Sequence, residues 1–311
     1  MKLIDLHCDT ASRMHRNLSA LAQNKFHISL EKINGFQNYG QLMAIFISNK
    51  LSDDEGYHRF FENYGYYVSQ IVSNSDKVSF ITSGTGLNDA WDAGKSAFFL
   101  SVEDARILNN DIERLSVLHK KGVRSLVFMW SGETCIGGSH NTNVGLSEFG
   151  RLVAEKCFEI GIVPDISHAS EQTAEDMINI ALLAGKPLIA SHSNSYSIYS
   201  HSRNLRDRHF KAICEMGGLV GLSLCRSHLT DSNNVGIDAI MRHIDYYLSL
   251  GGENTLSLGC DLDGTDLPDG FADIRDVMKI ADCMAQNNYS DELINKVFWG
   301  NAKSFFENNI N

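Results

Sequence analysis

Residues 145–170 read GLSEFGRLVAEKCFEIGIVPDISHAS, and this stretch decides the fold. Its first part carries apolar residues at helical spacing and ends in a glycine, as helix C-termini often do. A short apolar run, IVPDIS, follows and predicts a buried strand that stops at a histidine. The stretch is therefore one helix–strand unit of the kind that builds parallel sheets.

The same unit recurs along the chain. Short apolar segments predict eight strands, which are KLIDLH, QLMAIFIS, AFFLSVE, VRSLVFM, IVPDIS, PLIASH, GLVGLSL and TLSLGCD. Segments with helical spacing separate most of them, so the predicted fold class is α/β, a (β/α)8 barrel of the TIM type. A last segment, SDELINKVFWGNAKSFFENN, begins with a serine cap and predicts a C-terminal helix packed outside the barrel.

Length and charge narrow the class of protein. The 311 residues fit one large barrel, so residues 1–311 are predicted to form a single barrel domain. The formal net charge is −11, from 27 basic and 38 acidic residues. No run of Lys and Arg alternates with aromatic residues as in a nucleic-acid groove, so no nucleic-acid partner is expected.

The predicted location is cytoplasmic. The first residues, MKLIDLHCDT, already form a predicted strand and do not resemble a secretion signal. No apolar run is long enough to cross a bilayer, so no membrane association is expected. The seven cysteines form no CxxC pair and are interpreted as reduced core thiols.

Residues of the types that bind metal ions lie where predicted strands end. These candidate ligands are His7, Asp9, Glu103, His168 and His192. The strands of a parallel barrel end at one mouth, so these side chains can meet there. A single histidine or HxD triplet is more often structural, but several at strand ends favour ligands. Glu103 can bridge two cations about 3.5–4 Å apart, because a carboxylate has two oxygens. The pattern predicts a binuclear metal site.

Asp261 closes the last predicted strand in TLSLGCDLDG, where Gly259 and Gly264 permit tight backbone. It is the candidate base beside a metal-bound water, because a carboxylate there can carry the proton onward. Asp263 could bind metal or stabilise the turn, and the turn role is the favoured interpretation. Arg203, eleven residues after His192, is the candidate for binding a substrate carboxylate, which suits a guanidinium fork.

The remaining polar residues of these segments are given no chemical role. The hydroxyls next to the histidine ligands are interpreted as cap or turn groups. Asp104, beside Glu103, is expected to face elsewhere. Three further histidines lack a strand-end position and are expected at the surface. These residues are Ser167, Ser191, His140, His201 and His209.

Together these motifs resemble the membrane dipeptidase family, also called renal or microsomal dipeptidases, a branch of the amidohydrolase-like barrels. The resemblance covers nearly the whole chain. It rests on DLHCDT, the strand-end Glu103, the stretch at 145–170, SHSNSYSIYSHSRNLRD, GCDLDG and WGNAKSFF. The long central blocks are highly specific, whereas any single triplet is not.

The resemblance implies two Zn²⁺ ions bridged by Glu103. In the family, residues matching His7, Asp9 and Glu103 bind one zinc, and those matching Glu103, His168 and His192 bind the second. The residue matching Asp261 handles the proton, and the one matching Arg203 grips the substrate carboxylate. The implied function is a zinc-dependent dipeptidase that uses a metal-bridging hydroxide, on substrates that include dipeptides with a C-terminal D-residue. Family members often dimerise, so a homodimer stays open.

Three positions depart from the family pattern and border the substrate more than the metals. The family often has Thr-His-Asn or Thr-Trp-Asn where this chain reads Met129, Trp130 and Ser131. A histidine there helps stabilise the tetrahedral intermediate in some members, whereas the Trp130 indole can only donate one hydrogen bond to the substrate. Asp104 replaces a usual glycine, and Cys225 stands where an aromatic residue is frequent.

Two alternatives remain open. One is another barrel metallohydrolase acting on a cyclic amide, a lactone or a phosphoester, because fold does not determine function. Such enzymes often use a carboxylated lysine on the fourth strand as the bridge, and here Glu103 on the third strand is the better candidate. The other is a non-catalytic zinc-binding relative, which would bind zinc without turnover.

Overall fold

The computed structural model describes residues 1–310, so Asn311, the last residue of the predicted domain, lies outside it. The predicted α/β barrel is confirmed: eight parallel strands pair in a closed ring, and the pairing of β2 with β4 completes it. In ring order the strands are β1 (Lys2–Cys8), β2 (Asn38–Phe46), β4 (Ser96–Glu103), β5 (Val123–Val127), β6 (Val163–Asp165), β7 (Ile189–Ala190), β8 (Leu219–Leu222) and β9 (Leu256–Leu258).

A ninth strand, β3 (Val78–Phe80), was not predicted. It pairs with the first residues of β4, from Ser96 to Phe98. β5 pairs with β4 only from Leu100 onward, so β3 takes the place beside β4 that β5 leaves free. The strand lies outside the ring, and its three residues are too few to give a sequence signal.

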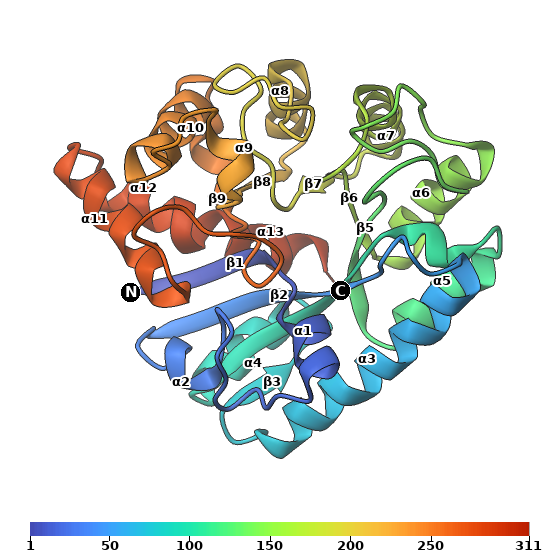
Figure 1. Cartoon of the computed structure of the whole chain (residues 1–311), viewed down its shortest axis with the longest axis horizontal. Helices are drawn as coiled ribbons and strands as arrows, with labels where there is room; N and C mark the ends of the chain where they lie inside the picture. The colour runs from blue at the N-terminus through green and yellow to red at the C-terminus, as the bar shows by residue number, and fades with distance from the viewer. Residues whose placement is uncertain (311) are drawn as a thin grey trace.

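Helices surround the ring (Figure 1). The longer ones are α1 (Thr10–Asn17), α3 (Asp53–Ser73), α4 (Thr85–Asp92), α5 (Ile112–Lys120), α6 (Glu148–Ile160), α7 (Glu171–Ala184), α8 (Asp207–Glu215), α10 (Ile237–Ser249) and α11 (Met278–Gln286). The shorter ones are α2 (Leu30–Ile33) and α9 (Arg226–Leu229). Local chemistry sets their ends: the Ser147 hydroxyl caps α6 at its N-terminus, and Gly161 ends it in the left-handed conformation.

The C-terminal segment corrects one expectation. It forms α12 (Asp291–Asn295), a π-helical turn over Lys296–Gly300 and α13 (Asn301–Asn309). The prediction that this helix packs outside the barrel is wrong, because its aromatic residues close the N-terminal end of the barrel interior. Phe305 and Phe306 share one apolar cluster with inward-facing strand residues such as Ile4 and Leu42. Figure 1 accordingly places the C-terminus near the centre of the ring of helices.

The barrel interior is therefore apolar at one end and polar at the other. Inward-facing positions at the strand starts carry Ile4, Leu42 and Phe99, while the strand ends carry His7 and Glu103. Functional residues of this fold sit at the C-terminal ends of the strands, so the filled end provides rigidity and the open end provides the site.

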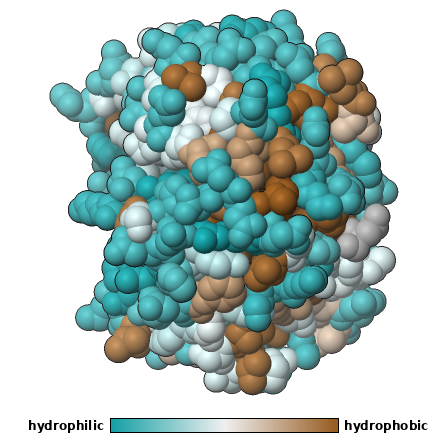
Figure 2. Space-filling model, turned by 90° about the vertical axis from the view of Figure 1, so that its right-hand side faces the viewer, coloured by the Kyte–Doolittle hydropathy of each residue, from teal (hydrophilic) through white to brown (hydrophobic). Residues whose placement is uncertain are grey.

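The face of the molecule seen in Figure 2 is mostly hydrophilic. Figure 2 shows the side of the molecule that lies on the right in Figure 1, where hydrophobic residues form separate patches. The large apolar side chains exposed on α6 and α7 are Leu152, Leu182 and Leu183. Within residues 1–310, no helix combines the length and the apolar character that crossing a membrane would need.

Replacing Phe306 with Ala tests the closure of the barrel by α13. The ring is fully buried and its centroid lies 4.8 Å from that of Phe99. The change therefore removes packing at the N-terminal end of the barrel interior, here called the barrel floor. We expect the free energy of unfolding to fall by about 3–5 kcal/mol in urea denaturation. Leu183→Ala is the control, because that side chain is 90% exposed and should change stability by less than about 0.5 kcal/mol. Equal effects would contradict this role of α13.

Candidate metal centre

Six residues from distant parts of the chain meet at the polar mouth of the barrel. They line or adjoin one cavity of about 670 Å³. His7 and Glu103 come from the ends of β1 and β4, whereas the others directly follow β1, β6, β7 and β9. These others are Asp9, His168, His192 and Asp261. The structure therefore brings together every residue predicted as a metal ligand and the predicted base.

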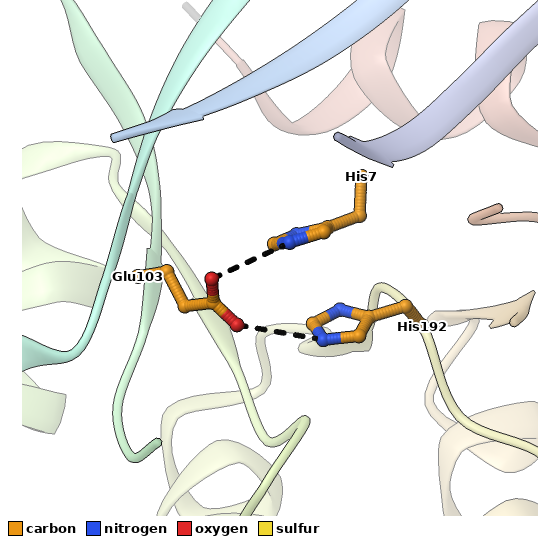
Figure 3. A group of neighbouring side chains, drawn as sticks. All are labelled: His7, Glu103 and His192. Atoms are coloured by element: carbon orange, nitrogen blue, oxygen red, sulfur yellow. Dashed lines mark ion pairs between the residues drawn. The ribbon is translucent and has the colours of Figure 1, made fainter. Parts of the chain in front are cut away.

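Glu103 lies between two groups of histidines. One carboxylate oxygen, Oε2, is 3.6 Å from Nε2 of His7. The other, Oε1, is 3.0 Å from Nε2 of His168 and 3.6 Å from Nε2 of His192. Figure 3 shows this carboxylate pointing one oxygen at His7 and the other at His192. The two oxygens thus belong to different sets of donor atoms.

The first set surrounds His7. Its Nε2 is 3.8 Å from Oδ2 of Asp9 and 3.9 Å from Oδ1 of Asp261. Nε2 of His7, which faces these carboxylates, and Oδ1 of Asp9 are buried without a hydrogen-bond partner among residues 1–310. Buried polar atoms are normally paired. A cation among these donors satisfies them, so the residues fit a metal ion.

The second set contains two facing imidazoles. Nε2 of His168 and Nε2 of His192 are only 2.9 Å apart and both point at Oε1 of Glu103. Burial lowers the pKa of both histidines well below its ordinary value, and the charges of nearby basic groups lower it further. Both rings are therefore neutral, which is the form that binds metal ions.

The carboxylates raise one another's affinity for protons. Burial raises the pKa of Glu103, and the charge of Asp9 raises it further. Burial raises the pKa of Asp261 to about 8; His7 lowers it, while Asp9 and Glu103 raise it. Burial alone would lower the pKa of His7, but the carboxylates of Glu103 and Asp9 raise it well above its usual value. The site thus holds excess negative charge, which a metal cation can balance.

An irregularity in β1 places His7 in the interior. Ile4 and Leu6 already belong to the inward-facing cluster, so simple alternation would send the next residue outward. The pairing of β1 with β2 shifts between Asp5 and Cys8, as in a β-bulge. His7 therefore faces the mouth, while Cys8 packs in the outer core and its Sγ lies 3.2 Å from Sδ of Met43.

Glycines make room for the crowded mouth. A methyl group on Gly264 would lie 2.2 Å from Oδ2 of Asp9 and 2.4 Å from Oδ1 of Asp261. A methyl group on Gly259 would lie 1.7 Å from the carbonyl oxygen of Ser191. Only glycine allows these approaches, in agreement with the tight backbone predicted at both positions.

Two buried aspartates that the sequence prediction missed hold the ligand segments in place. Oδ1 of Asp165 accepts hydrogen bonds from the backbone N–H groups of Ser167 at 2.8 Å and Ser191 at 3.0 Å. Asp5 accepts from the backbone N–H groups of His7 at 3.2 Å and Cys260 at 2.8 Å. Each acceptor joins two strand ends beside ligands or the base. Their signal in the sequence is a carboxylate inside an apolar strand, in KLIDLH and IVPDIS.

The serines beside the histidine ligands also orient them. Oγ of Ser191 lies 2.8 Å from Nδ1 of His192, and Oγ of Ser167 accepts the backbone N–H of His192 at 3.1 Å. Interpreting them only as cap or turn groups is therefore wrong. Hydrogen bonds of this kind set the ring orientation of a metal-binding histidine.

Asp104 and Asp263 have structural partners, as expected. Asp104 points away from the cavity, 3.4 Å from Nε of Arg106, and its φ of +89° is unusual for a residue with a side chain. Burial raises its pKa to about 7, although Arg106 lowers it. Asp263 accepts hydrogen bonds from Oγ1 of Thr10 at 2.6 Å and from the backbone N–H of His27 at 2.7 Å.

Arg203 and Trp130 both line the cavity. Arg203 is 5% exposed, and its guanidinium donates to the carbonyl oxygen of His192 at 3.3 Å. Its Nε has no hydrogen-bond partner among residues 1–310. Trp130 packs edge-on against Phe46 at 4.8 Å between ring centroids, and together they form an aromatic wall. Cys225 adds a thiol to the lining.

The expected surface position of three histidines is wrong. His209 is 2% exposed, His201 is half-buried and His140 lines the cavity. The backbone N–H of His140 donates to the carbonyl oxygen of His168 at 2.7 Å, and burial lowers the pKa of His140 to about 4. His209 lies on the buried face of α8. His140 lies in a loop and carries no local signal, because only the path of that loop brings it to the mouth.

A TIM-type barrel with histidines and carboxylates gathered at its mouth defines the class of barrel metalloenzymes. The sequence profile described as membrane dipeptidase, peptidase family M19, matches residues 1–308. The chain therefore belongs to the membrane dipeptidase family and is a metallo-dipeptidase, as the sequence motifs predicted.

Known proteins resemble the chain in sequence and in structure. An uncharacterised protein from the pqqA 5′ region of Klebsiella pneumoniae is 28% identical over 66% of this chain and 79% of its own length. The crystal structure of dipeptidase AC, a family M19 metallopeptidase, has a TM-score of 0.92 at 24% identity and covers 100% of this chain and 99% of its own. A Rhodobacter sphaeroides metallopeptidase with a phosphinate mimic of L-Ala-D-Ala has a TM-score of 0.90 at 24% identity, with 99% of each chain covered.

Replacing Asp165 with Ala tests whether it holds the two histidine segments. The change leaves the N–H groups of Ser167 and Ser191 without their acceptor, so His168 and His192 lose their fixed positions. We expect metal affinity, measured by competition with a chelator, to fall about 10–100-fold. Asp165→Asn is the matched control, because its amide oxygen can still accept. If both variants bind metal as tightly as the unmodified chain, Asp165 does not position these ligands.

Proposed function

We propose that this metallo-dipeptidase uses two zinc ions bridged by Glu103 to hydrolyse the amide bond of dipeptides. The observation that carries the proposal is the division of the Glu103 oxygens between His7 on one side and His168 with His192 on the other. A carboxylate shared between two donor sets suits two cations held close together.

The two proposed metal positions use different residues. His7 and Asp9 would hold one zinc ion with Oε2 of Glu103, and His168 and His192 would hold the other with Oε1. Imidazole and carboxylate donors are ordinary zinc ligands. When bound, the ions would polarise the scissile carbonyl and lower the pKa of a water molecule.

Asp261 is the proposed proton carrier. It faces the cavity, and burial raises the pKa of its carboxylate to about 8. With cations balancing the charge of the cluster, the ionised carboxylate can take a proton from the attacking water and return it to the leaving amine. The amide is thereby hydrolysed to an acid and an amine without a covalent enzyme intermediate.

Arg203 and Trp130 are the proposed substrate contacts. The buried guanidinium of Arg203 lies in the cavity wall and can pair with the C-terminal carboxylate of a dipeptide. The indole N–H of Trp130 can donate one hydrogen bond to the bound substrate. Acceptance of a D-residue at the C-terminal position is part of the proposal, as are a cytoplasmic location and the open possibility of a homodimer.

The sequence of the fourth barrel strand argues against the alternative hydrolases that bridge their metal ions with a carboxylated lysine. β5 reads VRSLV and contains no lysine, so its side chains cannot supply such a bridge. The strand-end carboxylate of Glu103 occupies the bridging position between the histidine sets instead. This arrangement favours the dipeptidase over that group of barrel hydrolases.

A panel of dipeptides tests the proposed function. Zinc-loaded protein is incubated with L,L- and L,D-dipeptides, and amine release is measured with and without a chelator. We expect chelator-sensitive cleavage that is lost when the substrate is C-amidated, because Arg203 then has no carboxylate to bind. N-acetylated peptides test the need for the free amine. Two bound zinc ions without cleavage of any dipeptide would instead favour a non-catalytic relative.

Replacing Asp261 with Asn tests the proton carrier. The amide cannot accept the proton, so kcat should fall by at least about 100-fold on the best dipeptide. Zinc content, measured by elemental analysis, should stay the same, because His7, Asp9 and Glu103 remain. Retained turnover would remove Asp261 from this role. Loss of zinc in parallel with activity would make it a ligand instead.

A further inference from the structure

Helix α1 brings two guanidinium groups to the cavity that the proposed reaction does not use. Arg13 and Arg16 stand three residues apart on this helix, which places them on one face. Both line the same cavity as Asp9, Glu103 and Arg203. They follow β1, whereas Arg203 follows β7, and β8 and β9 separate these strands in the ring. The cavity therefore has cationic groups on two separate sides.

In the part of the chain that the structure describes, Arg16 has no carboxylate partner, whereas Arg13 has one long ion pair. Arg16 is exposed and has no ion pair or side-chain hydrogen bond within residues 1–310. Nη1 of Arg13 lies 3.6 Å from Oδ1 of Asp263 and donates to the carbonyl oxygen of Asp263 at 3.3 Å. Within the same residues, Nε and Nη2 of Arg13 have no hydrogen-bond partner. Arg13 therefore keeps two of its nitrogens, and Arg16 its whole guanidinium group, for a ligand.

The helix dipole alone does not explain where Arg13 and Arg16 lie. Basic residues in the last turn of a helix interact favourably with its dipole, and Arg16 stands in that turn. This accounts for a positive charge but not for its position in the wall of the substrate cavity. The guanidinium of Arg13 also lies over the Phe26 ring, 5.1 Å from its centroid, and Phe26 lines the same wall. Packing of this kind restrains a guanidinium fork and favours carboxylate binding.

A dipeptide has one α-carboxylate, and Arg203 accounts for it under the proposed function. With the scissile carbonyl at the metal centre, the C-terminal residue extends toward Arg203. The N-terminal residue then extends to the side of Asp9, which directly precedes α1. A second carboxylate on that residue would meet Arg13 and Arg16, because guanidinium groups pair strongly with carboxylates.

We propose that Arg13 and Arg16 form a second anion subsite that selects dipeptides with an acidic N-terminal residue. The inference rests on the proposed function for the placement of the dipeptide, while the subsite itself rests on two arginines in the cavity wall, of which Arg16 has no carboxylate partner within residues 1–310. The substrate class is L-glutamyl or L-aspartyl dipeptides with a free C-terminal carboxylate.

The test compares charged and neutral substrates of equal size. Values of kcat/KM are measured for Glu-Ala, Gln-Ala, Ala-Glu, Ala-Gln and Lys-Ala with zinc-loaded protein. We expect the unmodified chain to favour Glu-Ala over Gln-Ala by at least about 10-fold, the range of one charge-assisted hydrogen bond. Arg16→Gln and Arg13→Gln should each reduce this ratio, and Arg16→Glu should favour Lys-Ala.

Arg151→Gln is the matched control for the loss of a positive charge. Arg151 is exposed on α6, pairs with Asp176 at 3.0 Å and does not line the cavity. Its replacement should leave the ratio of Glu-Ala to Gln-Ala unchanged. Unfolding midpoints of all variants show that each is folded. A ratio near one in the unmodified chain, or one that is insensitive to Arg16, would overturn the subsite. A preference for Ala-Glu over Ala-Gln that depends on Arg16 would overturn its N-terminal placement.

Binding separates failure of the subsite from failure of the dipeptidase proposal. If no dipeptide is cleaved, titration calorimetry with Glu-Ala and Gln-Ala measures recognition alone. Tighter binding of Glu-Ala that is lost in Arg16→Gln would support the anion subsite although the proposed reaction has failed. Equal binding of both dipeptides would overturn the subsite. Cleavage of Gln-Ala and Glu-Ala at equal rates would leave the dipeptidase standing and remove only the subsite.

Discussion

Repulsion among buried carboxylates is the constraint on which this structure depends. Asp9, Glu103 and Asp261 all approach one imidazole, that of His7, at the mouth of the barrel. Burial raises the pKa of Asp261 to about 8 and also that of Glu103, so the ionised forms are costly without a positive partner. Metal cations at this point would remove the cost, and the surrounding chain holds the donor atoms where such ions need them.

The scaffold holds these carboxylates in place in two ways: through packing at the N-terminal end of the barrel and through hydrogen bonds between strand ends. Phe306 of α13 packs on Phe99 and helps to fill the floor of the barrel, which keeps the strand ends fixed. Asp5 and Asp165 then tie neighbouring strand ends to each other through backbone N–H groups. A site built on strands with supporting hydrogen bonds holds its geometry better than one built on loops. The glycine at 264 leaves space for the carboxylates of Asp9 and Asp261.

Charge is unevenly distributed around the cavity. The proposed metal centre and the proposed substrate contacts lie in regions of opposite charge. The carboxylates cluster where the cations belong, while Arg203 lies on one side and Arg13 with Arg16 on another. The chain as a whole carries a formal charge of −11, so these arginines act locally against the overall field. The aromatic wall of Phe46 and Trp130 completes the lining. Trp130 and Cys225, where the sequence departs from the pattern expected of the family, lie in this lining.

The sequence by itself determined the eight barrel strands, the six residues around the metal centre and the family, because each ligand follows an apolar run that ends locally. Arg203, in the loop after His192, was instead predicted from its guanidinium chemistry and from the family resemblance. Only the tertiary structure decided that a shift in β1 turns His7 inward beside Leu6, that α13 closes the barrel floor, and that His140 and Arg16 reach the cavity. These features depend on strand pairing, packing and loop paths between distant segments, and such contacts leave no periodic pattern in the residues that make them.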